Sequence, residues 1–189
     1  NVLGSNDVVN IAVIGLANRG LALIEAVPAC TSARVSHICD VDDKYITKGI
    51  AFCKEKLDYL PEIEKDFRKI LENKDVDAVV IATPEHWHAP MSIMAMQAGK
   101  HVYVEKPCSH NPYETELLIA AQKKYNKLCQ MGNQQRSSRT SSLAVKEISE
   151  GIIGTPYMGS AFYYNIRKSI GIGKKVDVPK GLDWDLWQG

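Results

Sequence analysis

Short apolar, β-branched runs alternate along the chain with longer segments in which apolar residues recur at helical spacing. This alternation is typical of a parallel sheet covered by helices on both faces, because strands buried on both sides are continuously apolar. We therefore predict an α/β fold with a doubly wound parallel sheet of the Rossmann type. The predicted strands are Val9–Ile14, Arg34–Cys39, Asp77–Ala82, His101–Val104 and Leu128–Met131, with a weaker candidate at Leu60–Ile63.

Helices are expected between these strands. The strongest start signal is Asn111-Pro112-Tyr113-Glu114, which combines an N-cap residue, a proline at the first helical position and a capping-box glutamate. The other segments show apolar residues on one face or a stop signal such as Pro28. The predicted helices cover Gly20–Val27, Glu64–Asn73, a segment from Pro90 to Gly99, and Asn111 to about Tyr125.

The pattern changes after Gly132. A Ser- and Arg-rich stretch leads into a helix that ends near Glu150, and a strand-like run follows over Tyr157–Tyr164. We expect residues 1–133 to form a dinucleotide-binding domain. Residues 134–189 are expected to begin a second, C-terminal α/β domain, which stays incomplete in this chain.

Composition and charge narrow the class of partner. The chain has 23 Lys+Arg and 22 Asp+Glu, so no charge imbalance draws it toward nucleic acid or an anionic membrane. No apolar run approaches the roughly 20 residues that span a bilayer. The five cysteines are scattered and form no C-x-x-C pair, which favours neither a disulfide framework nor a zinc site. We expect a small-molecule partner, no nucleic acid or membrane partner, and a cytoplasmic location, or a periplasmic one if an export signal was removed before Asn1.

A candidate phosphate loop follows the first predicted strand. Gly15-Leu16-Ala17-Asn18-Arg19-Gly20 is a G-x-A-x-x-G version of the dinucleotide fingerprint at the start of a helix. Small residues suit this position because the backbone turns tightly and its N–H groups approach a pyrophosphate. Ala17 weakens the motif with a methyl group, and an ordinary strand-to-helix turn is the alternative. The candidate cofactor-binding residues here are Gly15, Ala17, Asn18, Arg19 and Gly20.

An acidic residue supports the cofactor interpretation. Asp40 ends the second predicted strand about 20 residues past the loop, where a carboxylate accepts hydrogen bonds from the adenosine ribose hydroxyls. A carboxylate there repels a 2′-phosphate, and no Arg follows it, so NAD is favoured over NADP. Lys44 keeps use of NADP open.

Further candidates follow the later strands, because ligands of doubly wound sheets bind beyond the carboxyl ends of the strands. Lys106 is placed to bind the substrate oxygen or relay its proton during hydride transfer, with Glu105 orienting it. A structural ion pair is the alternative for these two residues. His86 and His88 lack the further ligands that a metal site needs, so we predict a helix-cap or cofactor contact for them and no metal.

Taken together, these motifs resemble those of the Gfo/Idh/MocA family, named after glucose-fructose oxidoreductase, inositol dehydrogenase and rhizopine catabolism. The strongest piece is Glu-Lys-Pro after a strand that begins Gly-Lys-His-Val, within Gly-Lys-His-Val-Tyr-Val-Glu-Lys-Pro. The resemblance implies a two-domain NAD(P)-dependent oxidoreductase that acts on a sugar, cyclitol or related polyol and forms a homo-oligomer when full length. It implies that Lys106 binds substrate and relays its proton, and that the cofactor is lined by Thr83, Pro84, His88, Glu105 and Asn133. The matching segments are Ile11–Gly20, Cys39–Asp42, Asp77–Pro90 and Ala98–Pro107.

The same family carries an aspartate and a histidine one helical turn apart in its second domain, and this histidine is the usual acid/base candidate. No Asp-x-x-x-His follows residue 132 here, so we expect these 189 residues alone to be inactive. Three functions stay open. They are hydride transfer between NAD(P) and a secondary alcohol, a glycosidase that uses tightly held NAD to oxidise, eliminate and re-reduce its sugar, and a non-catalytic NAD-binding module.

Overall fold

The computed structural model describes residues 8–29 and 32–189. Cys30, one of the five cysteines, lies outside the described residues. Contacts divide the described part of the chain into two compact units. The first is made of the described residues up to Gly132 together with Val178–Gly189, and the second of Asn133–Asp177. None of the helices in the described part of the chain has the length and apolar character needed to cross a membrane.

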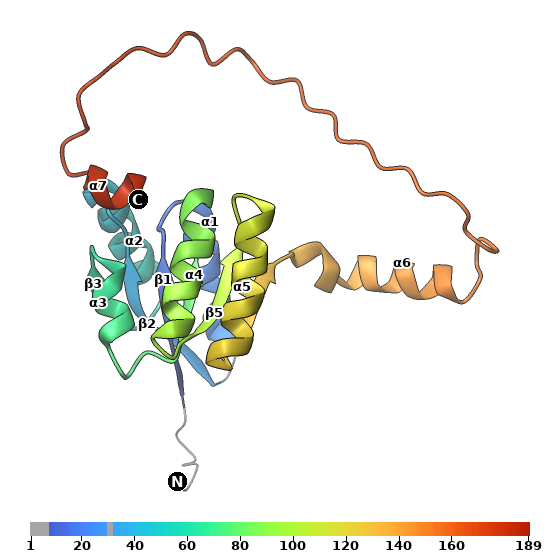
Figure 1. Ribbon diagram of the computed structural model, residues 1–189, viewed down its shortest axis with the longest axis horizontal. Coiled ribbons are helices and arrows are strands. Elements are labelled where there is room, and N and C mark those ends of the chain that lie inside the picture. The colour runs from blue at the N-terminus through green and yellow to red at the C-terminus, as the bar shows by residue number, and fades with distance from the viewer. Residues whose placement is uncertain (1–7, 30–31) are drawn as a thin grey trace, which may run out of the picture. The chain divides into compact units, whose positions relative to one another are not determined.

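The first unit is built on a six-stranded parallel sheet of strand order β3-β2-β1-β4-β5-β6 (Figure 1). The chain runs outward from β1 to β3 and then crosses back to β4, so the strand order reverses between β1 and β4. This confirms the predicted Rossmann fold. The strands are β1 (Val9–Ile14), β2 (Ala33–Cys39), β3 (Glu62–Glu64), β4 (Ala78–Ile81), β5 (His101–Glu105) and β6 (Cys129–Gly132).

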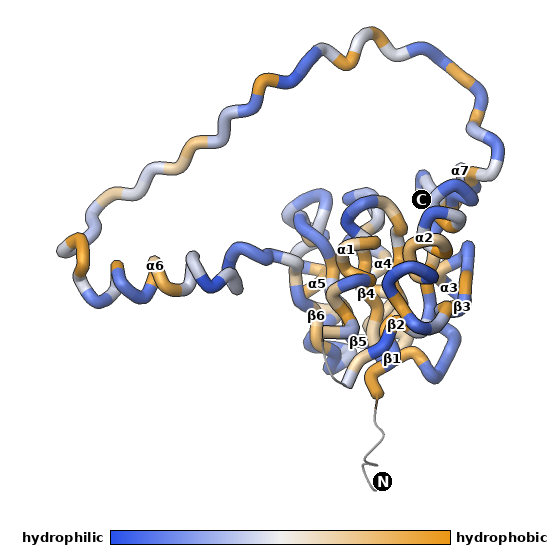
Figure 2. The backbone as a smooth tube through the Cα atoms, turned by 180° about the vertical axis from the view of Figure 1, so that it is seen from behind, coloured by the Kyte–Doolittle hydropathy of each residue, from blue (hydrophilic) through white to orange (hydrophobic). Residues whose placement is uncertain are grey.

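Helices cover both faces of the sheet. Alternate residues of β1 point to opposite sides, with Val13 in one buried cluster and Ala12 and Ile14 in the other. Figure 2 shows apolar residues running through the centre of this unit. One face carries α1 (Asn18–Ala26) and α2 (Asp43–Lys56), and the other carries α3 (Phe67–Glu72), α4 (His88–Gln97) and α5 (Pro112–Tyr125).

The predicted start of α5 is confirmed in detail. The Asn111 side chain accepts a hydrogen bond from the Glu114 backbone N–H at 3.0 Å, and the Glu114 carboxylate accepts one from the His110 N–H at 2.7 Å. These two bonds satisfy backbone donors near the helix start that no intrahelical carbonyl can reach.

Helix α2 was not predicted from the sequence. Its buried face is narrow and includes a glycine among the larger residues Ile46 and Cys53. A Cβ atom on Gly49 would lie 2.8 Å from the Leu16 side chain, so the absence of a side chain lets α2 approach the loop after β1 closely. The signal available in the sequence was the cap, since the Asp42 side chain accepts a hydrogen bond from the Lys44 backbone N–H.

The second unit contains the short helix η3 (Gln134–Ser137) and α6 (Arg139–Ser149), so the helix predicted to end near Glu150 is confirmed. The strand-like run predicted over Tyr157–Tyr164 is wrong: this segment forms no strand with any other described part of the chain, and Tyr157 and Phe162 are 96% and 92% exposed. A strand without a partner gains neither ladder hydrogen bonds nor side-chain contacts. The assignment of residues 134–189 to a second domain stays a prediction.

Candidate functional site

The carboxyl ends of four strands lie in register. Ile14 of β1 pairs with Cys39 of β2 on one side and with Ile81 of β4 on the other, and Ile81 pairs with Val104 of β5. The parallel register therefore brings together side chains that are far apart in the sequence. The next residues along each strand form a row at this edge: Gly15, Asp40, Ala82 and Glu105.

Two glycines of the predicted phosphate loop are required by packing. Gly15 has φ of +92°, and a Cβ atom there would lie 2.6 Å from the backbone C and O of Ala82. A Cβ atom on Gly20 would lie 1.8 Å from the Gly15 carbonyl oxygen. The loop thus turns tightly against the end of β4, as a phosphate-binding turn requires.

The N-terminus of α1 has no side-chain cap among the described residues. Its N-cap residue is Ala17, and none of the described side chains caps it, whereas α2 and α5 are capped by Asp42 and Asn111. Ala17, Asn18 and Arg19 are exposed. The backbone N–H groups at a helix start have no intrahelical partner, and together with the positive end of the helix dipole they suit an anionic group.

Asp40 holds the phosphate loop to the end of β2. One carboxylate oxygen accepts the Leu16 N–H at 2.7 Å and the other accepts the Asp42 N–H at 3.0 Å. Burial raises the pKa of Asp40, although these backbone hydrogen bonds oppose the shift. Each carboxylate oxygen has a second lone pair, so Asp40 can anchor the loop and still accept hydrogen bonds from a ligand hydroxyl. The anchoring role was not predicted from the sequence.

Glu105 ties β5 to the phosphate loop. The Arg19 Nε lies 2.7 Å from the Glu105 carboxylate, which is 8% exposed. Burial lowers the pKa of Arg19, but the hydrogen bond and charge of Glu105 raise it overall. The Glu105 carboxylate thus forms an ion pair with Arg19. The orientation of Lys106 by Glu105 stays a prediction. Lys106 is exposed and follows directly along the chain.

His88 joins the loops after β4 and β5. Its side chain is buried, with Nδ1 lying 2.5 Å from the Pro107 carbonyl oxygen and Nε2 lying 2.9 Å from that of Thr83. Both ring nitrogens are therefore occupied by main chain. The sequence predicted a helix-cap or cofactor contact for His88. In the structure its ring bridges the two loops, so we expect it to position them.

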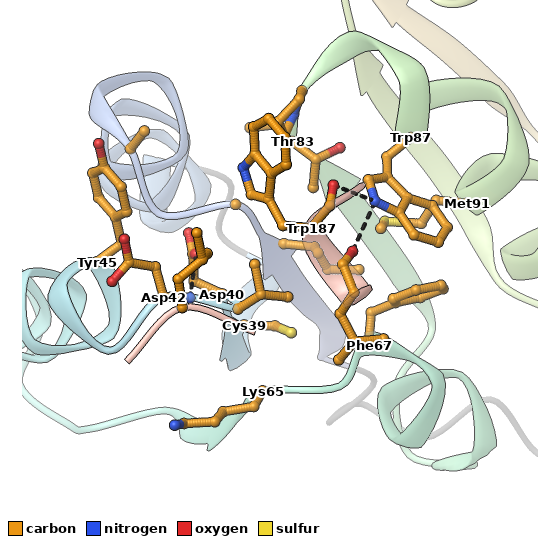
Figure 3. A pocket seen from close by; sticks show the side chains of 18 of the residues that line it. Cys39, Asp40, Asp42, Tyr45, Lys65, Phe67, Thr83, Trp87, Met91 and Trp187 are labelled. Carbon is orange, nitrogen blue, oxygen red and sulfur yellow. Dashed lines mark hydrogen bonds between the residues drawn. The ribbon is translucent and has the colours of Figure 1, made fainter. Parts of the chain in front are cut away.

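A cavity of about 510 Å³ opens at the β2–β1–β4 part of this edge (Figure 3). Asp40, Asp42 and Tyr45 lie on one side of it, and Thr83, Trp87 and Met91 lie on the other (Figure 3). The described residues that line this cavity do not include Lys106, which follows β5 farther along the edge. Several lining residues were not predicted from the sequence, namely Tyr45, Lys65, Phe67, Trp87, Met91 and a group from the C-terminal segment.

The other predicted residues take different places. Pro84 lines the cavity and precedes the short helix η2 (Glu85–Trp87). His86 lies in η2, with its Nε2 2.8 Å from the Trp187 carbonyl oxygen. Asn133 follows β6 and begins the second unit.

Three observations fit a dinucleotide at this edge. Gly15 has no Cβ atom, and a Cβ there would fill the turn, so the backbone of the loop stays open to the close approach of a ligand. The α1 N-terminus offers donors for a pyrophosphate. The Thr83 hydroxyl is buried and makes no hydrogen bond with any residue that the structure describes, so a polar ligand atom would satisfy it.

Comparison with known proteins agrees with this geometry. Residues 9–133 match the oxidoreductase family with an NAD-binding Rossmann fold, GFO_IDH_MocA. A curated relative from Shewanella sp. (strain W3-18-1), a glycosyl hydrolase family 109 protein, is 28% identical over 96% of this chain, which spans 40% of the length of that relative.

Solved structures show the same fold. A probable dehydrogenase from Thermotoga maritima superposes with a TM-score of 0.70 at 29% identity, over 78% of this chain and 43% of that one. The scyllo-inositol dehydrogenase from Lactobacillus casei, solved with NAD(H) and scyllo-inositol, has a TM-score of 0.68 at 24% identity, over 78% of this chain and 42% of its own. The family match over residues 9–133 establishes that the chain belongs to the Gfo/Idh/MocA oxidoreductase family and carries its NAD-binding Rossmann domain.

Proposed function

We propose that the protein moves a hydride between NAD and a secondary alcohol carbon of a sugar, cyclitol or related polyol. The observation that carries this proposal is the 2.7 Å ion pair between Arg19 of the phosphate loop and Glu105 at the end of β5. It fixes the phosphate-binding turn next to the strand end that presents Lys106. A cofactor whose pyrophosphate lies on the loop would have its reactive end near that lysine.

The roles of the residues follow from their places at the edge. The loop from Gly15 to Gly20 binds the pyrophosphate, Asp40 accepts hydrogen bonds from the adenosine ribose, and Thr83 supplies a buried hydroxyl to the cofactor. NAD, when bound, supplies the hydride acceptor. Lys106 binds the substrate oxygen and takes up its proton as the alcohol is oxidised, returning the proton in the reverse direction.

A glycosidase that removes and returns the same hydride is the second candidate. It is favoured by the curated relative, which is named as a glycosyl hydrolase family 109 protein and matches 96% of this chain. Such an enzyme would oxidise its sugar, eliminate the leaving group and re-reduce the product on the same NAD. The machinery proposed above serves both reactions, because both begin with hydride removal beside Lys106.

NADH absorbance during turnover separates these functions. The full-length protein is mixed with NAD and either a panel of free polyols or a panel of glycosides, while NADH and released sugar are both measured. Net oxidation gives NADH in proportion to product. Release of sugar without accumulation of NADH identifies the glycosidase. A protein that binds NAD but does neither is the non-catalytic module, and this result would contradict the proposal.

Asp40→Ser is expected to shift cofactor preference toward NADP. The carboxylate repels a 2′-phosphate, and serine removes this charge, so the ratio of NADP to NAD affinity should rise about tenfold. Serine also weakens the anchor to Leu16 and Asp42, but that loss affects both cofactors and cancels in the ratio. Fluorescence titration with NADH and with NADPH measures this affinity ratio. Asp75→Ser is the matched control, because Asp75 precedes β4 and lies at the amino ends of the strands, away from the site. An unchanged ratio in Asp40→Ser would contradict the ribose assignment.

A further inference from the structure

The C-terminal segment Pro179–Gly189, here called the strap, belongs to the first unit and lies against its carboxyl edge. One end is held by the loop between β2 and α2. The Asp43 N–H donates to the Gly181 carbonyl at 3.0 Å, and the Asp183 N–H donates to the Val41 carbonyl at 3.0 Å. These bonds flank an antiparallel bridge between Asp42 and Leu182.

The other end of the strap is held by η2, on the far side of the β1 loop. The Trp87 indole N–H donates to the Leu186 carbonyl at 2.9 Å and to that of Trp187 at 3.2 Å (Figure 3). The His86 and Trp187 rings meet edge to face with centroids 5.6 Å apart. Because the two anchors follow β2 and β4, the strap spans the strands that flank the phosphate loop.

Between its anchors the strap forms one wall of the 510 Å³ cavity. Its lining side chains are apolar or aromatic, and Trp184 stacks on Trp187 with centroids 5.0 Å apart. The sheet side of the cavity adds Cys39, Phe67 and Met91. Asp40, Asp42 and Lys65 also line it, so a mostly apolar space adjoins a few charged side chains. The volume falls within the range of about 300–1,000 Å³ that is usual for small-molecule sites.

We propose that the strap supplies the outer wall of the adenosine pocket, with Trp187 and Leu186 covering the adenine base. This rests on the proposed function, because it takes NAD as the ligand. A ribose that hydrogen-bonds Asp40 directs its base into the adjoining apolar space, and a flat base gains most from contact with apolar and aromatic side chains. Since the strap is tied down on both sides, it restricts the exit of the adenosine end until the anchor at Trp87 opens. The strap therefore also slows cofactor release.

Trp187→Ala in the full-length protein tests the proposal when its binding of whole NAD is compared with its binding of the adenosine part and of the nicotinamide part alone. Calorimetric titration with NAD and with ADP-ribose should show about tenfold weaker binding than the wild type, because the aromatic cover of the base is lost. Binding of nicotinamide mononucleotide, which has no adenine, should not change. Tyr113→Ala, which truncates an aromatic side chain that is 67% exposed on α5, is the matched control and should bind all three ligands like the wild type.

A second variant tests the anchor without emptying the pocket. Trp87→Phe removes the indole donor to Leu186 and Trp187 and keeps an aromatic ring beside Phe67, so it also serves if Trp187→Ala does not fold. The rate at which bound NADH is displaced, measured from the fluorescence of NADH itself, should be several-fold higher than in the wild type. Unchanged ADP-ribose affinity in folded Trp187→Ala, or an unchanged rate of NADH release in Trp87→Phe, would overturn the strap proposal. The proposed function would still stand in that case, provided that the wild type binds NAD. A wild type that binds neither NAD nor ADP-ribose would overturn both.

Discussion

Lys106→Ala is expected to lower turnover of the full-length protein by about 10²–10⁴-fold, the usual contribution of a positioned proton-transfer group. Its affinity for NAD should stay within about twofold, because the loop, Asp40 and Thr83 are unchanged and Lys106 lies outside the cavity that these residues line. We expect turnover and NAD affinity to respond separately, because Glu105 pairs with Arg19 and this contact with the loop survives the substitution of Lys106.

The measurement is steady-state turnover together with NAD titration of the same preparation. Lys123→Ala, an exposed lysine of α5, controls for loss of a surface charge. A Glu105→Gln variant gives a contrasting pattern: it weakens the tie to the phosphate loop and should therefore reduce NAD affinity as well as turnover. Full activity in Lys106→Ala would contradict the role assigned to this lysine.

Gly15→Ala is expected to destabilise the Rossmann unit by about 3–5 kcal/mol, a loss reached only by substitutions that break tight packing or force backbone strain. Both causes act here. The backbone of Gly15 has φ of +92°, and the new methyl group would lie 2.6 Å from backbone atoms of Ala82, which cannot turn aside as a flexible side chain could. NAD binding should be lost in whatever protein remains folded, because the loop and the end of β4 must move apart.

Gly99→Ala isolates the conformational part of this effect. Gly99 also has a left-handed backbone, with φ of +83°, but no atom of the described residues lies within 4 Å of its added Cβ. We expect it to cost only about 1–2 kcal/mol, the strain of the left-handed conformation. Urea unfolding of the two variants gives the comparison. Equal losses would show that the close approach of Gly15 to β4 does not constrain this site.

The sheet and the phosphate loop could be predicted because their signals are local. A strand buried on both faces is apolar throughout, and Val9–Ile14 was predicted residue for residue. Helix α2 was missed because its buried face contains a glycine that is explained only by the Leu16 side chain it packs against. The strand expected over Tyr157–Tyr164 failed for a related reason, since strand formation depends on a partner and not on propensity alone.

The candidate site shows the same difference between local signals and contacts that depend on the fold. Residue type and spacing were enough to select Gly15, Gly20 and Asp40, because tight turns and ribose recognition require those residues at those places. Pairings between distant segments could not be derived in this way. The contacts of Glu105 with Arg19, of His88 with Pro107, and of Trp187 with His86 join residues 19 to 101 positions apart and depend on the folded sheet.

A crystal structure of the full-length protein with bound NAD would show where each part of the cofactor lies. We expect the pyrophosphate on the backbone from Gly15 to Gly20, the adenosine ribose hydrogen-bonded to Asp40, the adenine beneath the strap, and the nicotinamide directed toward Lys106. Electron density for NAD with its pyrophosphate away from the α1 N-terminus, or with its nicotinamide directed away from Lys106, would contradict this expectation.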